Sequence, residues 1–148
     1  MTSANLQGYH AINLYYEDTD LSGFVYHANY LKYFERAREH LIGIDYLKNL
    51  YTSGLHFVVS KAELSYRAPA MHGDTLEIES TGTYSKSPAI PFTQQAWVNK
   101  EGSRLLVVEA AITIVALNKS NRPIRLPDET IKYFASRCAG RLVSQPAQ

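Results

Sequence analysis

The chain has 148 residues, a length typical of one domain that buries its own hydrophobic core. Its 15 Lys and Arg side chains nearly balance 14 Asp and Glu side chains, so no overall field favours nucleic acid or an anionic membrane as a partner. The single cysteine, Cys138, excludes an intrachain disulfide and a cysteine-based metal site. The N-terminal stretch has neither a basic leader nor an apolar run, so we expect no signal peptide and a cytoplasmic protein.

The first third of the chain is predicted to contain a strand, a turn and the only long helix. Residues 9–16 alternate in polarity as a β-strand does. Apolar residues then recur at helical spacing over 28–42, and Gly43 is a natural helix end. A shorter helical turn is expected over 45–51.

The rest of the chain is predicted to be mostly strands. These cover residues 56–67, 75–84, 92–99 and 104–117, separated by turns rich in Gly, Pro and Asn. The last strand is apolar on both sides, which predicts a central position or cover on both faces. A helix over 128–137 follows, and the tail from residue 140 is expected to be loose. One long helix followed by antiparallel strands predicts a single α+β domain over 1–148.

An acidic turn separates the first strand from the long helix. Asp18, Asp20 and Gly23 lie just before the helix, where free backbone N–H groups and the helix dipole stabilise negative charge. A carboxylate there can attack an acyl carbonyl or activate water against it. The alternative is that both aspartates are turn or cap residues, and we favour this alternative for Asp18.

The residues around this turn resemble the signature of a known family. They read Glu17-Asp18-Thr19-Asp20, then Gly23, then Val25-Tyr26-His27-Ala28-Asn29-Tyr30, and then Phe34-Glu35-Arg36-Ala37-Arg38. This pattern is similar to that of hotdog-fold acyl-CoA thioesterases, in particular the 4-hydroxybenzoyl-CoA thioesterase group and its Tol-Pal-associated bacterial branch. The resemblance implies a hotdog fold, in which an antiparallel sheet wraps around one long central helix.

The resemblance also implies roles for single residues. Asp20 matches the catalytic carboxylate, which serves as nucleophile or general base. The backbone N–H of His27 would polarise the thioester carbonyl as an oxyanion hole does, and its ring is a candidate contact to substrate or to Asp20. Gly23 would allow a tight turn and close approach of the acyl group, and Tyr26 is a candidate substrate contact.

Glu35 is a second candidate carboxylate, because some hotdog thioesterases use a helix glutamate as the catalyst. The alternative is a solvated, ion-paired helix face, in which Glu35 and Glu39 are flanked by Arg36 and Arg38. We favour this alternative for Glu35.

Three basic residues are candidate contacts to the phosphates of coenzyme A. Lys86, Arg122 and Arg125 fall roughly where relatives place basic side chains. Ordinary surface loops are an equal alternative for each of them. The chain departs from the family pattern over 87–91, where two prolines remove backbone donors and put pantetheine contacts of that segment in doubt.

Other active-site chemistries find little support in the sequence. The stretch from Asp18 to Gly23 imitates the start of a calcium-binding loop, but position twelve is Asn29 and a strand precedes it instead of a helix. The five histidines form no zinc-protease motif, and no G-x-S-x-G nucleophile elbow occurs. We therefore expect no metal and no other cofactor.

The sequence therefore predicts an acyl-CoA thioesterase that releases a carboxylic acid and coenzyme A. Two alternatives remain: hydrolysis of an acyl chain from acyl carrier protein, and a non-catalytic acyl-binding or scaffold protein. We expect a homodimer or homotetramer, because the apolar strand over 57–66 would be a costly exposed edge and because hotdog proteins associate through such an edge. No uncharged run is long enough for a membrane-spanning helix, so no integral membrane contact is expected.

Overall fold

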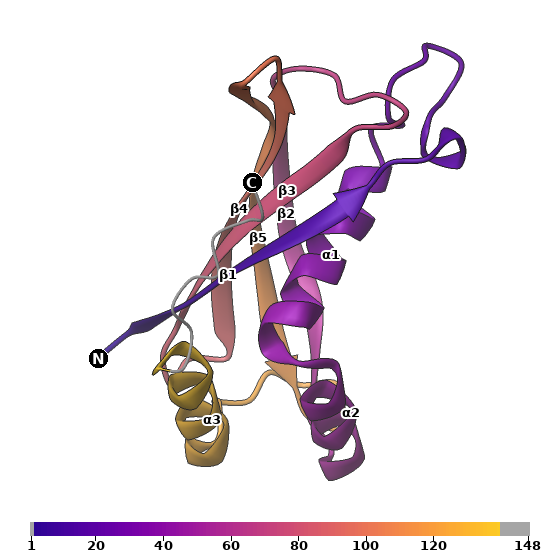
Figure 1. Cartoon of the computed structure of the whole chain (residues 1–148). Coiled ribbons are helices and arrows are strands. Elements are labelled where there is room, and N and C mark those ends of the chain that lie inside the picture. Colours follow the sequence, from indigo (N-terminus) through magenta and orange to yellow (C-terminus); the bar gives the residue numbers. More distant parts are fainter. Residues whose placement is uncertain (1, 140–148) are drawn as a thin grey trace.

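The computed structural model of the protein describes residues 2–139, so the tail expected to be loose lies outside the described residues. The elements follow in chain order (Figure 1): β1 (Ala4–Asn13), a 3-10 turn (Tyr16–Asp18), α1 (Asn29–Ile42), α2 (Ile44–Ser53), β2 (His56–Tyr66), β3 (Thr75–Tyr84), β4 (Ala89–Lys100), β5 (Ser103–Leu117) and α3 (Asp128–Ala139). None of the helices in this part of the chain is long and apolar enough to cross a membrane.

The strands form one five-stranded antiparallel sheet in the order β1-β3-β4-β5-β2. Helix α1 crosses one face of this sheet, which curls around it (Figure 1). The acidic turn and the β4–β5 hairpin lie at one end of the sheet, and α2 and α3 lie at the other. The last strand, β5, lies between β4 and β2, as predicted for an interior strand, but mainly its alternate residues are buried.

Helix α1 forms where the sequence predicts it, because its apolar stripe faces the sheet. Buried positions recur every three or four residues along it: Tyr30, Tyr33, Phe34, Ala37, Leu41 and Ile42. Complete burial of a side chain such as Phe34 contributes on the order of 2 kcal/mol. Leu31, which also fits the helical spacing, is 46% exposed and does not belong to the stripe.

A polar network lies beneath the same helix and corrects one expectation. Arg38 is only 6% exposed, so it is not part of a solvated, ion-paired face as predicted. Its guanidinium donates to the Gln94 Oε1 atom at 3.0 Å, and the Gln94 amide donates to the Phe34 carbonyl and the Ser80 hydroxyl. Buried polar groups need such partners, and these come from β3 and β4.

Strand β1 lies earlier in the chain than predicted, and β4 begins earlier than predicted. Strand β1 ends at Asn13, and Tyr16, which was expected to end the first strand, begins the 3-10 turn instead. Leu6, which precedes the predicted range, is fully buried in the strand that pairs with β3. Strand β4 begins at Ala89 and includes Pro91. Its ladder with β3 begins only at Phe92, so the missing N–H of Pro91 removes no bond from that ladder.

Strand β2 is an edge strand, and most of its residues are exposed. Its register with β5 shifts between Val59 and Lys61, which is a β-bulge at Ser60. On both sides of the bulge, apolar β2 residues pair with buried β5 residues: Phe57 with Ala116, Val59 with Ile114, Ala62 with Ile112, Leu64 with Ala110, and Tyr66 with Val108. The inner side of this edge is therefore apolar along its whole length.

Candidate active site

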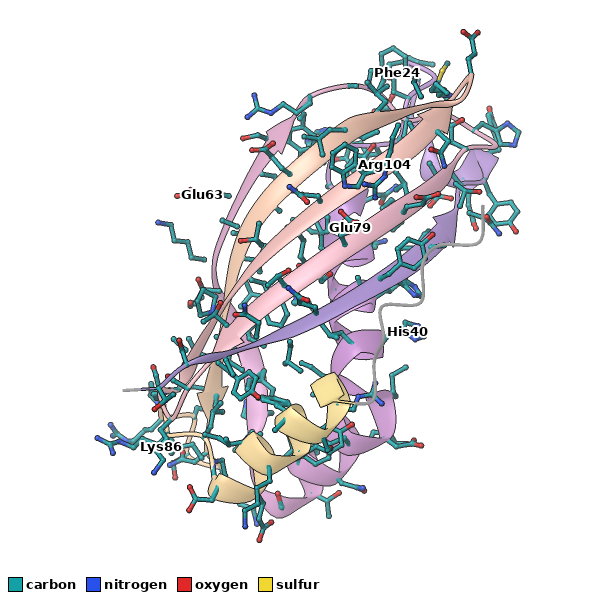
Figure 2. All side chains as sticks on the ribbon, turned by 60° about the vertical axis from the view of Figure 1, so that its left-hand side comes forward. Phe24, His40, Glu63, Glu79, Lys86 and Arg104 are labelled. Atoms are coloured by element: carbon teal, nitrogen blue, oxygen red, sulfur yellow. The ribbon has the colours of Figure 1, made fainter. Side chains whose placement is uncertain are left out.

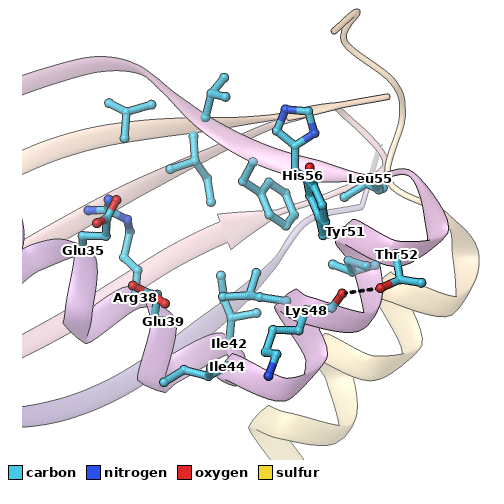
Figure 3. Close-up of a pocket in the computed structure, with 16 residues that line it drawn as sticks. Glu35, Arg38, Glu39, Ile42, Ile44, Lys48, Tyr51, Thr52, Leu55 and His56 are labelled. Carbon is cyan, nitrogen blue, oxygen red and sulfur yellow. Dashed lines mark hydrogen bonds between the residues drawn. The ribbon is translucent and has the colours of Figure 1, made fainter. Parts of the chain in front are cut away.

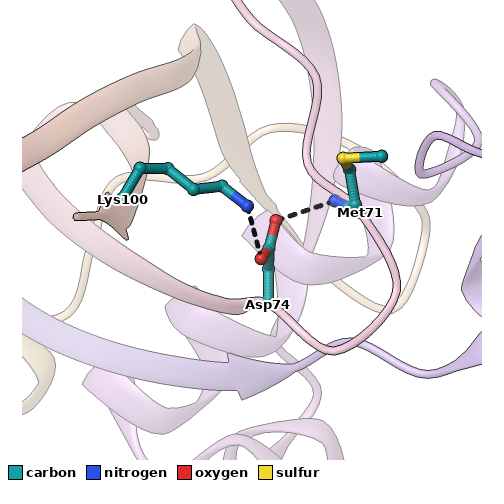
Figure 4. A network of polar contacts seen from close by, with 3 residues as sticks. All are labelled: Met71, Asp74 and Lys100. Atoms are coloured by element: carbon teal, nitrogen blue, oxygen red, sulfur yellow. Dashed lines mark hydrogen bonds and ion pairs between the residues drawn. The ribbon is translucent and has the colours of Figure 1, made fainter.

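The acidic turn connects β1 to α1 and is fastened to a neighbouring turn. The backbone of Thr19 pairs with that of Val25, and the Val25 N–H donates to the Ala70 carbonyl at 2.8 Å. The second turn is itself fixed by Asp74, whose carboxylate accepts the Met71 N–H at 2.9 Å and the Lys100 ammonium at 2.7 Å (Figure 4). These bonds give the exposed acidic loop a defined shape.

Gly23 completes the acidic turn. Its φ of +86° lies in the left-handed region, where glycine meets no steric penalty. No atom of the described chain lies within 4 Å of the place where its Cβ would be. The conformation of the turn, not crowding within the chain, therefore requires glycine here.

Asp20 is fully exposed in this turn, and its carboxylate is held on one oxygen. Its Oδ1 atom accepts the Ser22 backbone N–H at 2.8 Å and the Ser22 hydroxyl at 2.5 Å. These bonds, led by the hydroxyl and helped by nearby His27, hold the pKa of Asp20 below its ordinary value. Oδ2 accepts no hydrogen bond from residues 2–139, so an ionised carboxylate presents a free oxygen.

Asp18, by contrast, uses both carboxylate oxygens within the fold. Oδ2 accepts the Tyr15 N–H at 2.8 Å, and Oδ1 accepts the Tyr33 hydroxyl. Its backbone carbonyl accepts the Tyr26 N–H and the Asn29 side-chain amide, each at 2.9 Å. Asp18 is therefore a structural residue that ties the acidic turn to α1, which agrees with the interpretation favoured from the sequence.

His27 and Tyr26 form the entrance to α1, next to the acidic turn. Both side chains are exposed, and their rings lie 4.7 Å apart. In the part of the chain that the structure describes, no hydrogen bond uses the backbone N–H of His27 or of Ala28. The charge of His27 helps to lower the pKa of Asp20, so the two free N–H groups belong to the part of the chain that electrostatically influences this carboxylate.

Glu35 lies farther along α1 and faces a different feature. It is six residues beyond Asn29, about 9 Å along the helix axis. There it is exposed and lines a pocket of about 710 Å³ between α1, α2 and β2 (Figure 3). Arg38 lies beside it, whereas Ile42, Leu47 and Phe57 belong to the apolar wall. The sequence did not predict this pocket, because its walls come from elements whose packing depends on the whole sheet.

The three candidate basic residues lie at the opposite end of the sheet from Asp20. Lys86 follows β3, and its carbonyl accepts the Leu126 N–H at 3.0 Å, which brings Arg125 close to it. Arg122 lies in the same loop after β5, and all three side chains are exposed. Figure 2 shows Lys86 at one end of the sheet and Phe24, from the acidic turn, at the other. Because β3 has ten residues, these ends lie roughly 30 Å apart.

Sequence reasoning missed two residues that shape this site. Ser22 holds Asp20, and Tyr66, from β2, donates its hydroxyl to the His27 carbonyl at 3.0 Å. The serine could have been found, because a hydroxyl two residues after an aspartate in a turn is a common local partner. The tyrosine carries no such local signal, because its partner lies 39 residues away.

A curled antiparallel sheet around one long helix, with an exposed carboxylate in the turn before that helix, defines a hotdog-fold protein of the thioesterase type. Residues 16–134 match the model of the thioesterase-like superfamily, and the chain belongs to this family. The predictions of a hotdog fold, of this family and of a thioester hydrolase are thereby confirmed.

Individual relatives agree with this membership. The acyl-CoA thioester hydrolase YbgC of Escherichia coli O6:H1 is 35% identical over 126 residues, which cover 83% of this chain and 92% of that protein. A probable thioesterase from Bartonella henselae is 29% identical, with a TM-score of 0.66 over 82% of this chain and 99% of that one. A 4-hydroxybenzoyl-CoA thioesterase complexed with 4-hydroxybenzoyl-CoA shares the fold, with 17% identity and a TM-score of 0.78 over 86% and 98% of the two chains.

Proposed function

We propose that the protein hydrolyses acyl-CoA thioesters and that Asp20 is the catalytic carboxylate. The observation that carries this proposal is Asp20, whose lowered pKa favours the ionised form and whose Oδ2 atom is free, in the turn that precedes the free N–H groups of His27 and Ala28. The names of the relatives support the choice of acyl-CoA as substrate.

In the proposed reaction, the thioester carbonyl oxygen receives hydrogen bonds at the helix entrance. Asp20 either attacks the carbonyl carbon or takes a proton from the water that does so. Negative charge then develops on the carbonyl oxygen, where the N–H groups stabilise it. The thiolate of coenzyme A leaves and is protonated. In the nucleophile route, water then hydrolyses the mixed anhydride, and both routes yield a carboxylic acid and a free thiol.

We also propose that the active unit is a dimer or a higher oligomer built through the β2 edge. The exposed, apolar inner side of β2 supports this, because pairing with a second copy would remove the unpaired edge from water. Antiparallel pairing about a two-fold axis would place the acidic turn of one protomer beside the opposite end of its partner. The basic residues Lys86, Arg122 and Arg125 of one protomer would then bind the phosphates of the coenzyme A held by the partner's Asp20.

The same pairing gives a role to the pocket between α1, α2 and β2. This pocket lies along the first part of β2, residues 56–59, which would face the partner's acidic turn in such a pair. Its apolar wall suits the acyl group, while Glu35 and Arg38 lie on its polar side. We propose that this pocket receives the acyl chain. We also propose that the protein works in the cytoplasm.

The test is a screen of the purified protein against short, long and aromatic acyl-CoAs and an acyl chain on acyl carrier protein, following thiol release. Turnover of at least one acyl-CoA is expected. Faster turnover of the carrier-protein ester would instead favour the acyl carrier protein alternative. Binding of acyl-CoA without thiol release would favour the non-catalytic alternative and overturn the proposal.

A further inference from the structure

Tyr66, at the end of edge strand β2, contacts the entrance of α1. Its hydroxyl donates a hydrogen bond of 3.0 Å to the carbonyl oxygen of His27. Its ring stands edge-on to the His27 ring, with 6.2 Å between centroids, and lies 5.9 Å from the Tyr30 ring. Tyr30 is only 3% exposed, so the ring that supports Tyr66 is itself fixed in the core.

The bond from Tyr66 acts on the N–H of Ala28. The His27 carbonyl and the Ala28 N–H belong to one planar trans peptide, so they point in opposite directions, and fixing one fixes the other. The preceding peptide is held in the same way, because the Tyr26 carbonyl accepts the Asn29 N–H at 2.9 Å. A peptide whose carbonyl accepts a hydrogen bond is also a stronger donor at its N–H.

We propose that Tyr66 is a positioning residue that orients the Ala28 N–H as an oxyanion donor, next to that of His27. This inference rests on the proposed thioester hydrolysis. Tyr66 acts through the peptide and does not touch the reacting atoms. The resemblance in sequence implied only the backbone N–H of His27 as an oxyanion donor. The Tyr66 contact extends the role of oxyanion donor to the N–H of Ala28.

The charge state of Tyr66 agrees with this role. Burial raises the pKa of the Tyr66 hydroxyl above its ordinary value. The hydroxyl therefore keeps its proton at neutral pH, where the Asp20 carboxylate is ionised, and remains a donor there. Its contribution should not depend on pH across the neutral range.

The test removes the hydroxyl and keeps the ring. Tyr66→Phe is expected to lower kcat on the order of tenfold with KM changed less than about twofold, because a weakened donor matters most when charge develops on the substrate oxygen. The matched control is Tyr46→Phe, which loses a hydroxyl bond of 3.1 Å to the Thr130 Oγ1 atom at the opposite end of the molecule. The control should keep the wild-type kcat.

A second readout does not depend on activity. In the wild-type protein and both variants, nuclear magnetic resonance should show the Ala28 amide shifts moving in Tyr66→Phe only. Unchanged Ala28 shifts, a wild-type kcat for Tyr66→Phe, or equal losses in both variants would each overturn the inference. The assignment of Asp20 as the catalyst would fail on a different result, namely an active Asp20→Asn variant. The failure of the Tyr66 inference and the failure of the proposed catalyst can therefore be told apart.

Discussion

At the scale of single residues, the two candidate carboxylates can be separated by isosteric substitution. Asp20→Asn removes a reacting group with little change in shape, so kcat is expected to fall at least about a hundredfold. The kcat of Glu35→Gln is expected to fall far less, because Glu35 lies farther along α1, on the wall of a pocket. Steady-state thiol release for both variants is the measurement. An inactive Glu35→Gln with a nearly wild-type Asp20→Asn would assign the chemistry to the helix glutamate.

The bond from Ser22 to Asp20 makes a prediction about pH. A carboxylate with a lowered pKa stays ionised to lower pH, so activity is lost only as the pH falls through that lowered value. Ser22→Ala removes the largest cause of the shift but keeps the backbone N–H, so the acid limb of the kcat profile should move to higher pH. Ser136→Ala, which removes an exposed hydroxyl on α3, should leave the limb in place. An unmoved limb in Ser22→Ala would mean that the hydroxyl does not control the ionisation of Asp20.

At the scale of elements, α3 stabilises the end of the central helix. Arg137 donates three hydrogen bonds of 3.1–3.2 Å to the carbonyls of His40 and Leu41, in the last turn of α1. A cation at this place also interacts favourably with the helix dipole.

Loss of this cap should lower stability. Arg137→Ala is expected to reduce the free energy of unfolding by about 1–2 kcal/mol, since charged donors at a helix C-terminus are removed. The thermal unfolding midpoint, followed by circular dichroism, measures the change. Lys132→Ala, on an exposed position of the same helix, should cost much less. Equal losses in the two variants would argue against a specific cap.

Elements were predictable from the sequence where local pattern and packing agree. Helix α1 and strand β3 match their predicted bounds closely, because an amphipathic stripe ending at Gly43 and an alternating strand are both local signals. The end of β1 was missed, because residues 14–16 alternate as a strand does, whereas the turn that follows Asn13 is tied by Asp18 to Tyr33, fifteen residues away. The burial of Arg38 was missed for the same reason, since its partner Gln94 lies 56 residues away.

The candidate site divides in the same way. The Asp20 turn and the entrance of α1 were predictable, because both lie within one continuous stretch of sequence. The position of the basic residues relative to Asp20 was not, because the direction in which each strand pairs decides which loops share an end of the sheet. Lys86 and Asp20 lie at opposite ends of one protomer, and no local pattern contains that information.

At the scale of the whole molecule, the β2 edge predicts an oligomer. The wild-type protein should elute well above the protomer mass of 16.7 kDa in size exclusion with light scattering. Val59→Glu places a charge on the apolar inner side of the edge, where Val59 is 47% exposed, and should lower both the mass and kcat. Leu105→Glu, at a similarly exposed site on β5, is the control. A wild-type monomer with full activity would contradict a site shared between two copies.

The bulge in β2 has a consequence for the chemistry at the other end of that strand. In a regular strand, side chains alternate between the two faces. Because Phe57 and Val59 face inward, all odd-numbered residues of β2 would then face inward and all even-numbered residues would face outward. The extra residue at Ser60 reverses this alternation, so that the even-numbered residues Ala62, Leu64 and Tyr66 face inward. The bulge therefore lets the Tyr66 hydroxyl reach the His27 carbonyl. Deletion of Ser60 would restore the regular alternation and point the same tyrosine away from the helix.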